Sequence, residues 1–540
     1  MQMKRDTREF AWQHEYNELD VRVASVRPDG HRVDWLTYGS GHVHGMLLDG
    51  LSVAEFERDD GHREIVRELR NELKQTTAYD EAGRLAHQVL QGTSGKLLER
   101  RYEYDAAGQL EQIADMRRGE LRYAYDPIGR LTRAQSSLGV ETFAFDPASN
   151  LQEPSERDAH GIGLIAARAT PALLDNLIKD YAGTHYTYDK RGNLQERTVN
   201  GAAMTFEWDS FNRMVSASNW DMSVRYLYDA LGRRIAKLAQ AVVPVRPSAG
   251  SGWQEHERTR INAERGYGLT LYGWEGDTLA YETSERDKTT THYVYEPGSF
   301  TPLMQAKAAA GVMLDDSVTK VQPIRAAAYY HCDQIGTPQE LTDSDGELAW
   351  SAKYRAWGEA KEAISEAARK AGIGNPLRFA GQYHDAETGL HYNRHRYYDP
   401  STGRFISKDP IGLEGGLNAF QYAPNPTGWI DPLGLTVTIP PTITASDITN
   451  KTRTEIRNLA RQKGLVLARS DATGAPIKWK CPCTGKERLR LDRGHTDPST
   501  GLAYNDRKAA VDHVHAYDST GRVKVVSPDD GNPHFPTTGE

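Results

Sequence analysis

The sequence predicts a mainly β protein of stacked β-hairpins, followed by a small α+β domain at the C-terminal end. Three observations lead to this fold class. A unit of aromatic residues, Asp and Gly recurs at a spacing near 20 residues, the segment 426–435 closes that pattern, and the residues after it are basic and non-repetitive. We therefore expect a repeat array over 1–328, a closing domain over 329–435 and a C-terminal domain over 436–540.

The repeat has the form aromatic-x-aromatic-Asp-x2-Gly. Its copies contain Asp80, Asp105, Asp126, Asp146, Asp189, Asp209 and Asp229, which follow one another at 25, 21, 20, 43, 20 and 20 residues. Aromatic residues at i and i+2 share one face of a strand, Asp opens a tight turn, and Gly takes a positive φ. Each unit is therefore a β-hairpin, and neighbouring units must stack to bury their aromatic faces. The gap of 43 indicates one lost or replaced unit.

Other segments receive simpler predictions. Residues 27–39 are expected to form strand, turn and strand. The polar, Pro- and Gly-containing stretch 239–267 is expected to be an exposed loop. The Ala/Glu/Lys-rich run 359–370 is expected to be a short helix.

Composition excludes several classes of protein. No run of about 18 apolar residues exists, and the first residues lack the apolar region of a signal peptide, so we expect a chain made in the cytoplasm. Three cysteines cannot build a disulfide framework. The net charge of −8 divides into +4 for 436–540 and −12 for 1–435. A basic domain behind an acidic scaffold is typical of a nucleic-acid-binding tail held by its own container.

The block from Tyr330 onward is dense in aromatic residues and arginines. It contains His331-Cys332-Asp333-x2-Gly336, Phe379-Ala380-Gly381-Gln382-Tyr383, Arg394-x-Arg396-Tyr397-Tyr398-Asp399-Pro400 and Asp409-Pro410-Ile411-Gly412-Leu413. Together with the Tyr-Asp repeats, this block resembles the Rhs (YD-repeat) family and its core-associated region, over about four fifths of the chain. The resemblance implies a hollow β shell that encloses a C-terminal toxin. It also implies that the aromatic block plugs the end of the shell.

The segment Pro426-x4-Asp431-Pro432-x-Gly434-Leu435 matches the motif at which Rhs proteins cut themselves. A second Asp-Pro-x-Gly-Leu copy begins at Asp409, 22 residues earlier. Peptide hydrolysis by carboxylates needs one ionised and one protonated group, and proximity separates their pKa values. Asp409 and Asp431 are the natural catalytic pair, and the resemblance places the cut between Leu435 and Thr436. The competing interpretation is that Asp-Pro-x-Gly is simply a good turn.

The C-terminal domain begins with a Thr/Pro-rich tether. A capping box and an apolar stripe predict a helix over 452–464, and alternating patterns predict strands at 465–467, 477–481 and 489–491. A further alternating segment, 512–517, is expected to turn into 522–526 as a hairpin.

The candidate catalytic residues of this domain are His495, Asn505 and Arg493, with Asp492, His513, Asp512 and His515 as candidate metal ligands. The segment 481–495 resembles GH-E toxins of the HNH/endonuclease VII superfamily. That resemblance implies a divalent metal, Mg²⁺ or Zn²⁺, and a His that deprotonates water. The strand-like pattern around His513 and His515 departs from that family, which places a helical region there.

Three functions remain open on the sequence. The first is an antibacterial effector whose shell releases a metal-dependent nuclease acting on DNA or RNA. The second is a metal-independent ribonuclease in the same shell, using His495 or His513 with Arg493 or lysines. The third is a non-enzymatic surface or adhesion protein. The family resemblance implies a cognate immunity protein, delivery by a type VI secretion apparatus and action in target cells.

Overall fold

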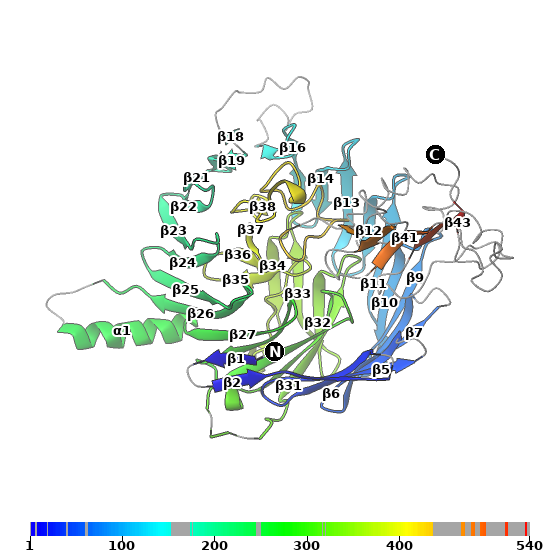
Figure 1. The fold of residues 1–540 in the computed structure, drawn as a ribbon, viewed down its shortest axis with the longest axis horizontal. Helices are drawn as coiled ribbons and strands as arrows, with labels where there is room; N and C mark the ends of the chain where they lie inside the picture. The colour runs from blue at the N-terminus through cyan, green and yellow to red at the C-terminus, as the bar shows by residue number, and fades with distance from the viewer. Residues whose placement is uncertain are drawn as a thin grey trace.

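A computed structural model gives the fold of the chain (Figure 1). It describes residues 2–435, apart from 6–7, 19, 39–41, 60–62, 153–172, 175, 245–249, 316 and 319, and beyond 435 the backbone of five strands. The missing repeat unit expected after Asp146 falls in 153–172, outside the described residues. In the described part of the chain no helix is long and apolar enough to cross a membrane.

The first large sheet has 13 antiparallel strands, and each strand pairs with its neighbours in sequence. Figure 1 shows it in blue and cyan. Its strands are β3 (Gln13–Tyr16), β4 (Arg22–Val26), β5 (Arg32–Tyr38), β6 (His42–Leu48), β7 (Leu51–Arg58), β8 (Glu64–Leu69), β9 (Lys74–Tyr79), β10 (Leu85–Gly92), β11 (Gly95–Tyr104), β12 (Leu110–Asp115), β13 (Gly119–Tyr125), β14 (Leu131–Ser136) and β15 (Gly139–Thr142).

The second large sheet has 15 strands in the same sequential order. They are β20 (Asp180–Tyr181), β21 (Thr184–Tyr188), β22 (Leu194–Val199), β23 (Ala202–Trp208), β24 (Met214–Ser218), β25 (Met222–Tyr228), β26 (Arg234–Ala241), β27 (Leu269–Glu275), β28 (Thr278–Ser284), β29 (Thr289–Tyr295), β30 (Pro302–Ala309), β31 (Ala326–Cys332), β32 (Pro338–Asp343), β33 (Leu348–Tyr354) and β34 (Ala360–Ile364). The fold class is therefore confirmed as mainly β, with hairpins stacked along the chain.

Smaller elements complete the shell. They are β1 (Gln2–Arg5) with β2 (Arg8–Ala11), β16 (Ala144–Phe145) with β17 (Leu151–Gln152), β18 (Leu173–Leu174) with β19 (Leu177–Ile178), two 3-10 turns at Gly311–Met313 and Gly412–Gly415, and the helix α2 (Glu366–Lys370). A four-stranded sheet of β35 (Tyr383–Asp385), β36 (Leu390–Asn393), β37 (Arg396–Asp399) and β38 (Arg404–Phe405) follows.

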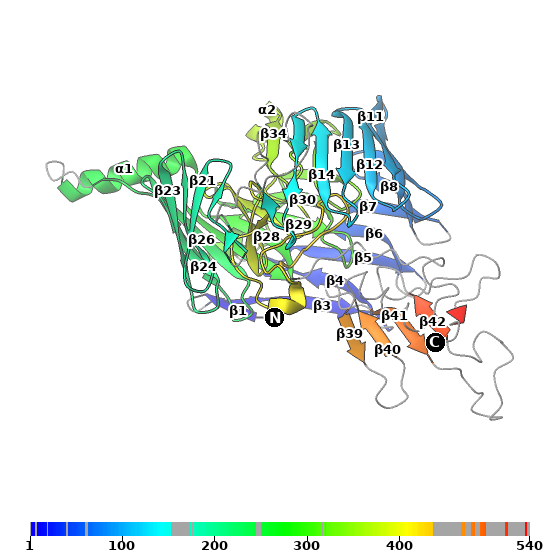
Figure 2. The same cartoon turned by 90° about the horizontal axis from the view of Figure 1, so that it is seen from above.

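Two local predictions need correction. The stretch 239–267 is not only a loop, because the helix α1 (Gly250–Arg265) lies within it and projects from the second sheet (Figures 1 and 2). Four hydrogen bonds, in three pairs of glutamate and arginine three or four residues apart, stabilise this exposed helix. In 359–370 only Glu366–Lys370 is helical, and β34 occupies the first half.

The repeat turn has the chemistry that the sequence predicts. At Asp80 the carboxylate accepts the Arg84 backbone N–H at 2.8 Å and the Arg84 Nε–H at 2.7 Å. The backbone N–H of Asp80 donates to the Arg84 carbonyl, and Gly83 has φ +77°. Asp suits this position because its short side chain can accept hydrogen bonds from backbone N–H groups two to four residues later in the chain.

Neighbouring units are joined by the side chains of the same repeat. The Tyr104 hydroxyl donates to the Leu85 carbonyl at 2.9 Å, and the Arg84 guanidinium lies 4.4 Å from the centre of the Tyr104 ring. The next units repeat this arrangement, with Arg213 lying 5.1 Å from the Tyr228 ring centre. Each turn arginine therefore fixes its own turn and the aromatic residue of the following unit.

The aromatic faces point into the core. Tyr102, Tyr186, Phe206 and Tyr226 are each no more than 4% exposed. The largest core cluster joins these repeat positions of the second sheet to Tyr392 and Tyr397 of the four-stranded sheet. The closing domain is therefore part of the same hydrophobic core as the repeats.

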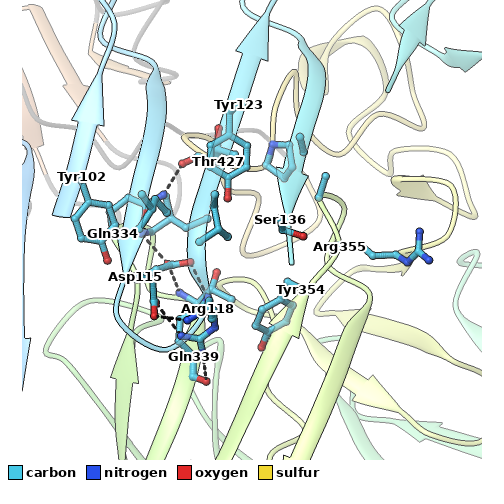
Figure 3. A pocket seen from close by; sticks show the side chains of 18 of the residues that line it. Tyr102, Asp115, Arg118, Tyr123, Ser136, Gln334, Gln339, Tyr354, Arg355 and Thr427 are labelled. Carbon is cyan, nitrogen blue, oxygen red and sulfur yellow. Dashed lines mark hydrogen bonds and ion pairs between the residues drawn. The ribbon is translucent and has the colours of Figure 1, made fainter. Parts of the chain in front are cut away.

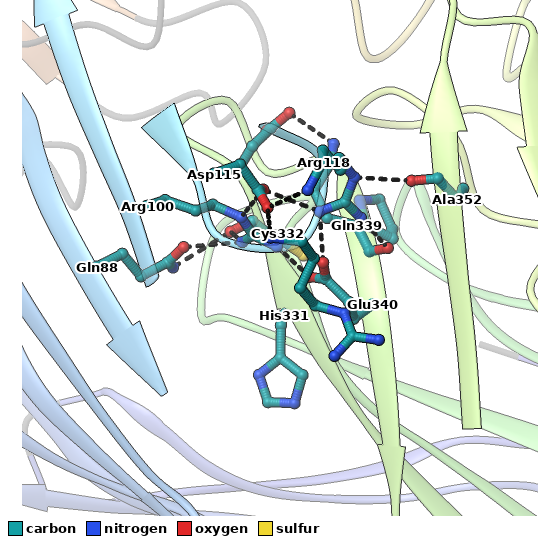
Figure 4. Close-up of polar contacts among 12 residues, drawn as sticks. Gln88, Arg100, Asp115, Arg118, His331, Cys332, Gln339, Glu340 and Ala352 are labelled. Atoms are coloured by element: carbon teal, nitrogen blue, oxygen red, sulfur yellow. Dashed lines mark hydrogen bonds and ion pairs between the residues drawn. The ribbon is translucent and has the colours of Figure 1, made fainter. Parts of the chain in front are cut away.

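A buried ionic cluster ties the first sheet to the second (Figure 4). Arg100 pairs with Asp115 at 3.0 Å and with Glu340, and Arg118 pairs with Asp115 at 2.9 Å and with Glu340 at 2.5 Å. Two cations and two carboxylates compensate one another, which such deeply buried charges require. This cluster fixes strands β11 and β12 against β32.

Beyond Leu435 the structure describes a five-stranded sheet in sequential order. Its strands are β39 (Val466–Arg469), β40 (Ile477–Lys480), β41 (Glu487–Asp492), β42 (His513–Ala516) and β43 (Phe535–Pro536). The predicted strand near 465–467 and the hairpin 477–491 are thus confirmed. The predicted helix over 452–464 and the segment 522–526 lie outside the described residues, and β42 pairs with β41 and β43.

Candidate self-cleavage site

The site lies at the tight hairpin between β36 and β37, which is hydrogen-bonded to segment 431–435. The Asn393 side-chain amide donates to the Asp431 carbonyl at 2.7 Å, and the His395 backbone N–H donates to the Leu433 carbonyl at 3.1 Å. Segment 431–435 is thereby held against a rigid element of the closing domain.

Arg396 lies at the centre of the site. Its Nη2 is 2.9 Å from Asp409 Oδ2 and 3.3 Å from Asp431 Oδ2. Its Nε–H donates to the Gly434 carbonyl at 2.6 Å. The side chains of all three charged residues are no more than 3% exposed. One buried guanidinium therefore brings the two predicted aspartates together and also contacts the segment that would be cut.

The two aspartates differ in what else they contact. Asp431 Oδ1 accepts the Leu435 backbone N–H at 2.9 Å, which closes the turn 431–435. Asp409 Oδ1 accepts the Ile411 backbone N–H at 3.0 Å. Both Asp-Pro-x-Gly copies are therefore turns, as the competing interpretation expects, and their carboxylates also converge.

The carbonyl of Leu435 lies next to Asp409. A Cβ added to Gly415 would stand 2.2 Å from Asp409 Oδ2 and 2.7 Å from the Leu435 carbonyl oxygen, so both oxygens border the space beside Gly415. A second glycine, Gly381, has its missing Cβ position 2.0 Å from the Pro432 carbonyl oxygen. Side chains at these two positions would displace the segment.

The pKa of Asp409 is raised to about 6, mainly by burial and to a smaller extent by the Asp431 carboxylate, while Arg396 and the Ile411 N–H oppose the rise. Burial also lowers the pKa of Arg396 against the pull of both carboxylates. A carboxylic acid with this pKa can be protonated near neutral pH. The arrangement thus offers one proton donor near the Leu435 carbonyl oxygen and a second carboxylate hydrogen-bonded to the backbone N–H of the same residue.

The remaining candidates lie after Leu435. Thr436, Arg493, His495, Asn505 and Asp512 fall outside the described residues. Asp492 ends β41 and is the register partner of His513 in β42, while His515 pairs with Arg490. His513 and His515 are two residues apart in one strand and so share one of its faces.

Another group of imidazole and carboxylate atoms lies close enough to hold a metal ion, at Asp29, His31 and His292. Arg27 Nη1 is 2.9 Å from His292 Nδ1, and an arginine can only donate. His292 Nδ1 must therefore accept, so its Nε2 carries the hydrogen and faces Asp29 at 3.2 Å. The His292 N–H and the adjacent Arg27 guanidinium are donors that would repel a metal ion. The three residues therefore link turn 27–31 to β29 and do not form a metal site.

Sequence reasoning missed Arg396, Asn393, Gly415 and Gly381. Arg396 was visible only as one of several arginines in the aromatic block, and nothing in its spacing selects it. The glycines carry no chemical signal, because their role is to leave space for a segment distant in sequence.

Stacked Tyr-Asp hairpins closed by an aromatic and arginine-rich domain define a YD shell. Residues 50–243 match the Teneurin YD-shell model, and residues 328–364 match the RHS protein model. These two matches support a YD shell over 50–243 and an RHS segment over 328–364.

Curated relatives match over most of the chain. "Double-stranded DNA deaminase toxin A" of Burkholderia cenocepacia is 37% identical over 437 residues, covering 78% of this chain and 28% of that protein. "Toxin protein Tse5" of Pseudomonas aeruginosa is 34% identical, covering 79% of this chain and 34% of that protein. "Probable deoxyribonuclease RhsA" of Dickeya dadantii is 32% identical, covering 67% and 24%. The chain spans about a quarter to a third of the length of these relatives.

Solved structures agree on the fold. The crystal structure of TcdB2-TccC3-Cdc42 has a TM-score of 0.56 at 18% identity and covers 80% of this chain and 23% of that chain. The crystal structure of TcdB2-TccC3-TEV has a TM-score of 0.52 at 17% identity, with the same coverage. At this identity the likeness concerns the fold alone.

Proposed function

We propose that the closing domain cuts its own chain between Leu435 and Thr436, and that the segment 436–540 is the toxin of an antibacterial Rhs effector. The observation that carries the first part is the convergence of Asp409, Asp431 and Arg396 on Gly434 and Leu435, the two residues directly before the bond. Two relatives named as toxins and one named as a probable deoxyribonuclease support the second part.

The contacts assign roles to the two carboxylates. Asp431, which accepts hydrogen bonds from Arg396 and the Leu435 N–H, is the ionised base that takes a proton from water. Asp409, beside the Leu435 carbonyl oxygen, is the acid that donates to it. The water oxygen bonds to the Leu435 carbonyl carbon and gives a tetrahedral diol. The C–N bond then breaks, the leaving amine of Thr436 takes up the proton that Asp431 received, and one hydroxyl of the diol returns its proton to Asp409 as the carboxylic acid of Leu435 forms.

Arg396 acts as a positioning residue in this mechanism. Its guanidinium holds both carboxylates through one nitrogen and the Gly434 carbonyl through another, so acid, base and peptide share one anchor. Burial of all three groups excludes water other than the reacting molecule and strengthens each interaction.

The test compares full-length chains by intact mass. Wild type is expected to yield 1–435 and 436–540, while Asp431→Asn and Asp409→Asn are expected to remain whole. Asp399→Asn is the matched control, because Asp399 is also buried and also precedes a proline but pairs with Arg197. If Asp431→Asn is still cut after Leu435, the aspartyl mechanism is wrong.

We further propose that 436–540 hydrolyses phosphodiester bonds in DNA or RNA with a divalent metal, Mg²⁺ or Zn²⁺. Asp492 and His513 stand at paired positions of β41 and β42, so a carboxylate and an imidazole come from adjacent strands, and such a donor set suits these ions. His515, Asp512, His495, Asn505 and Arg493 are the further candidates for ligands and catalysis. The ion would supply an activated water when bound.

The nuclease assay incubates the purified protein with plasmid DNA and total RNA, with Mg²⁺ or with EDTA. His495→Ala is compared with His185→Ala, a change at an exposed shell histidine. Loss of degradation with EDTA and with His495→Ala supports the proposal. Degradation that survives EDTA favours a metal-independent ribonuclease, and no degradation of either polymer favours other toxin chemistry or a non-enzymatic surface protein.

The same proposal includes partners and a place of action. A toxin kept by its producer requires an immunity protein, which we expect to be acidic to match the net charge of +4 on 436–540. We expect delivery into target cells by type VI secretion components. Co-expression of the downstream gene should restore growth to cells that make the toxin segment.

A further inference from the structure

A pocket of about 80 Å³ lies between strands β11 to β14 of the first sheet and the turn 333–337 of the second (Figure 3). Tyr102, Tyr123, Gln334, Thr337 and Tyr354 are among the residues that line it. Arg100, Asp115 and Arg118 of the buried ionic cluster form one of its walls (Figures 3 and 4). A comparison with the regular repeat turns indicates which chemical group would fit this pocket.

In the regular repeat turns an arginine four residues after the aspartate fills the corresponding space. Its Nε lies 2.7 Å from the aspartate Oδ2 in the pairs Asp80–Arg84, Asp126–Arg130 and Asp209–Arg213. The same guanidinium covers the aromatic ring of the next unit, at 4.4 Å from Tyr104, 4.9 Å from Phe145 and 5.1 Å from Tyr228.

The turn at Asp333 keeps this geometry without the arginine. The Asp333 backbone N–H donates to the Thr337 carbonyl at 3.0 Å, and the Thr337 N–H donates to Asp333 Oδ1 at 2.9 Å. Tyr354 is the aromatic residue of the next unit, because its hydroxyl donates to the Pro338 carbonyl at 2.8 Å, as Tyr104 does to Leu85. Thr337 stands at the position of the arginine and is too short to reach the carboxylate.

Several buried oxygen atoms that line the pocket accept no hydrogen bond from the described residues. Thr337 Oγ1, Gln334 Oε1 and the Tyr102 hydroxyl oxygen are buried and have no hydrogen-bond partner among the described residues. All three can accept hydrogen bonds. Asp333 Oδ2 accepts only the Gln339 side-chain amide, at 3.0 Å, in place of an arginine. A buried polar atom left unpaired costs free energy, so these acceptors favour a ligand rich in donors.

The charges around the pocket favour a cation. Arg100 and Arg118 are compensated by Asp115 and Glu340, as described above. Arg355, which is more than half exposed, pairs with Glu141 and Glu359. In the described part of the chain Asp333 has no arginine, lysine or histidine nitrogen within ion-pair distance, and burial raises the pKa of its carboxyl to about 6. The arginine-free turns at Asp146 and Asp189 are different, because Asn150 and Asn193 donate to these aspartates themselves.

We propose that this pocket binds a guanidinium group, which would pair with Asp333, cover the Tyr354 ring and satisfy the unpaired acceptors. A guanidinium has five donors and no acceptor, and it stacks on aromatic faces, so it matches this lining better than an ammonium. The group could come from an arginine side chain of 436–540, a segment with nine arginines, or from a small free molecule.

The probe is methylguanidinium, with methylammonium as the matched cation, added to the purified full-length chain. Hydrogen exchange of the turn 333–339 is followed by mass spectrometry in wild type, Asp333→Asn and Thr337→Arg. Asp343→Asn is the control, because Asp343 opens another turn of the second sheet, outside this pocket. A free site predicts saturable slowing of exchange by methylguanidinium, at least tenfold weaker with methylammonium or Asp333→Asn. Thr337→Arg should fill the pocket and abolish the effect.

An arginine of the same chain as occupant predicts a different pattern. The turn is then already protected, methylguanidinium adds nothing, and Asp333→Asn accelerates exchange while Asp343→Asn does not affect this turn. Replacing the nine arginines of 436–540 by lysine one at a time would then identify the occupant. The proposal is overturned if methylguanidinium acts no more strongly than methylammonium and Asp333→Asn leaves exchange of this turn as slow as in wild type.

Discussion

Self-cleavage is expected to slow as the pH rises through 6, because the proposed acid, Asp409, must be protonated. With a pKa of about 6, its protonated fraction is about 90% at pH 5, about 10% at pH 7 and about 1% at pH 8. The rate should therefore fall about ninetyfold between pH 5 and pH 8. The pKa of Asp409 lies above its ordinary value of 3.8, so the associated stability is complete below pH 3.8 and is lost as the pH rises through 6. That loss amounts to about 3 kcal/mol.

The assay starts from full-length chain unfolded in urea, in which the site is not assembled. Dilution into buffers from pH 5 to pH 8.5 starts folding, and the loss of the full-length band on a gel gives the cleavage rate. Tryptophan fluorescence recorded in parallel gives the folded fraction, so that slow folding is not mistaken for slow cleavage. Asp399→Asn should keep the pH profile, and Asp409→Asn should show no cleavage at any pH.

A rate that is flat from pH 5 to pH 8.5, or that rises with pH, would refute the assignment of Asp409 as the acid. A profile with the expected fall that persists in Asp409→Asn would assign the titration to another group. Because cleavage is normalised to the folded fraction, a change in the stability of the shell cannot produce either result.

Two further predictions concern packing. Gly381→Ala should reduce the yield of cleaved chain at least tenfold, because its Cβ would stand 2.0 Å from the Pro432 carbonyl oxygen. The control is Gly389→Ala, which is also at positive φ but has nothing within 4 Å of the added Cβ, so cleavage should be unchanged. The two yields are compared on one gel. Glu340→Gln removes one carboxylate from between two buried arginines and should lower the free energy of unfolding, measured by urea denaturation, by about 3 kcal/mol. The control is Glu347→Gln, at an exposed position. If Glu340→Gln lowers the free energy of unfolding no more than this control does, the cluster does not have the structural role described.

Much of the shell was predictable because its information is local. Each repeat carries its own turn aspartate, its positive-φ glycine and its aromatic pair, so hairpins could be derived from a few consecutive residues. The pairing of Asp409 with Asp431 was also predictable, because the two motif copies are identical in type. The helix α1 was missed because prolines and glycines at the start of its segment outweighed a helical pattern of charged residues.

The rest depended on contacts between distant residues. Arg396 becomes the anchor of the site only when β37 is placed beside both aspartates, and Gly415 matters only because Leu435 folds back against it. Thr337 is unremarkable in sequence, and its significance comes from a carboxylate and an aromatic ring that the fold places around a missing arginine.

The sequence by itself determined the repeating hairpins and the pair of aspartates, because short-range turn chemistry and strand periodicity act within a few residues. Only the tertiary structure decided which arginine joins the carboxylates, which carbonyl faces Asp409 and where a buried acceptor lacks its donor. The physical reason is that burial and electrostatic pairing depend on groups far apart in the chain, and these meet only when the two sheets and the closing domain pack together.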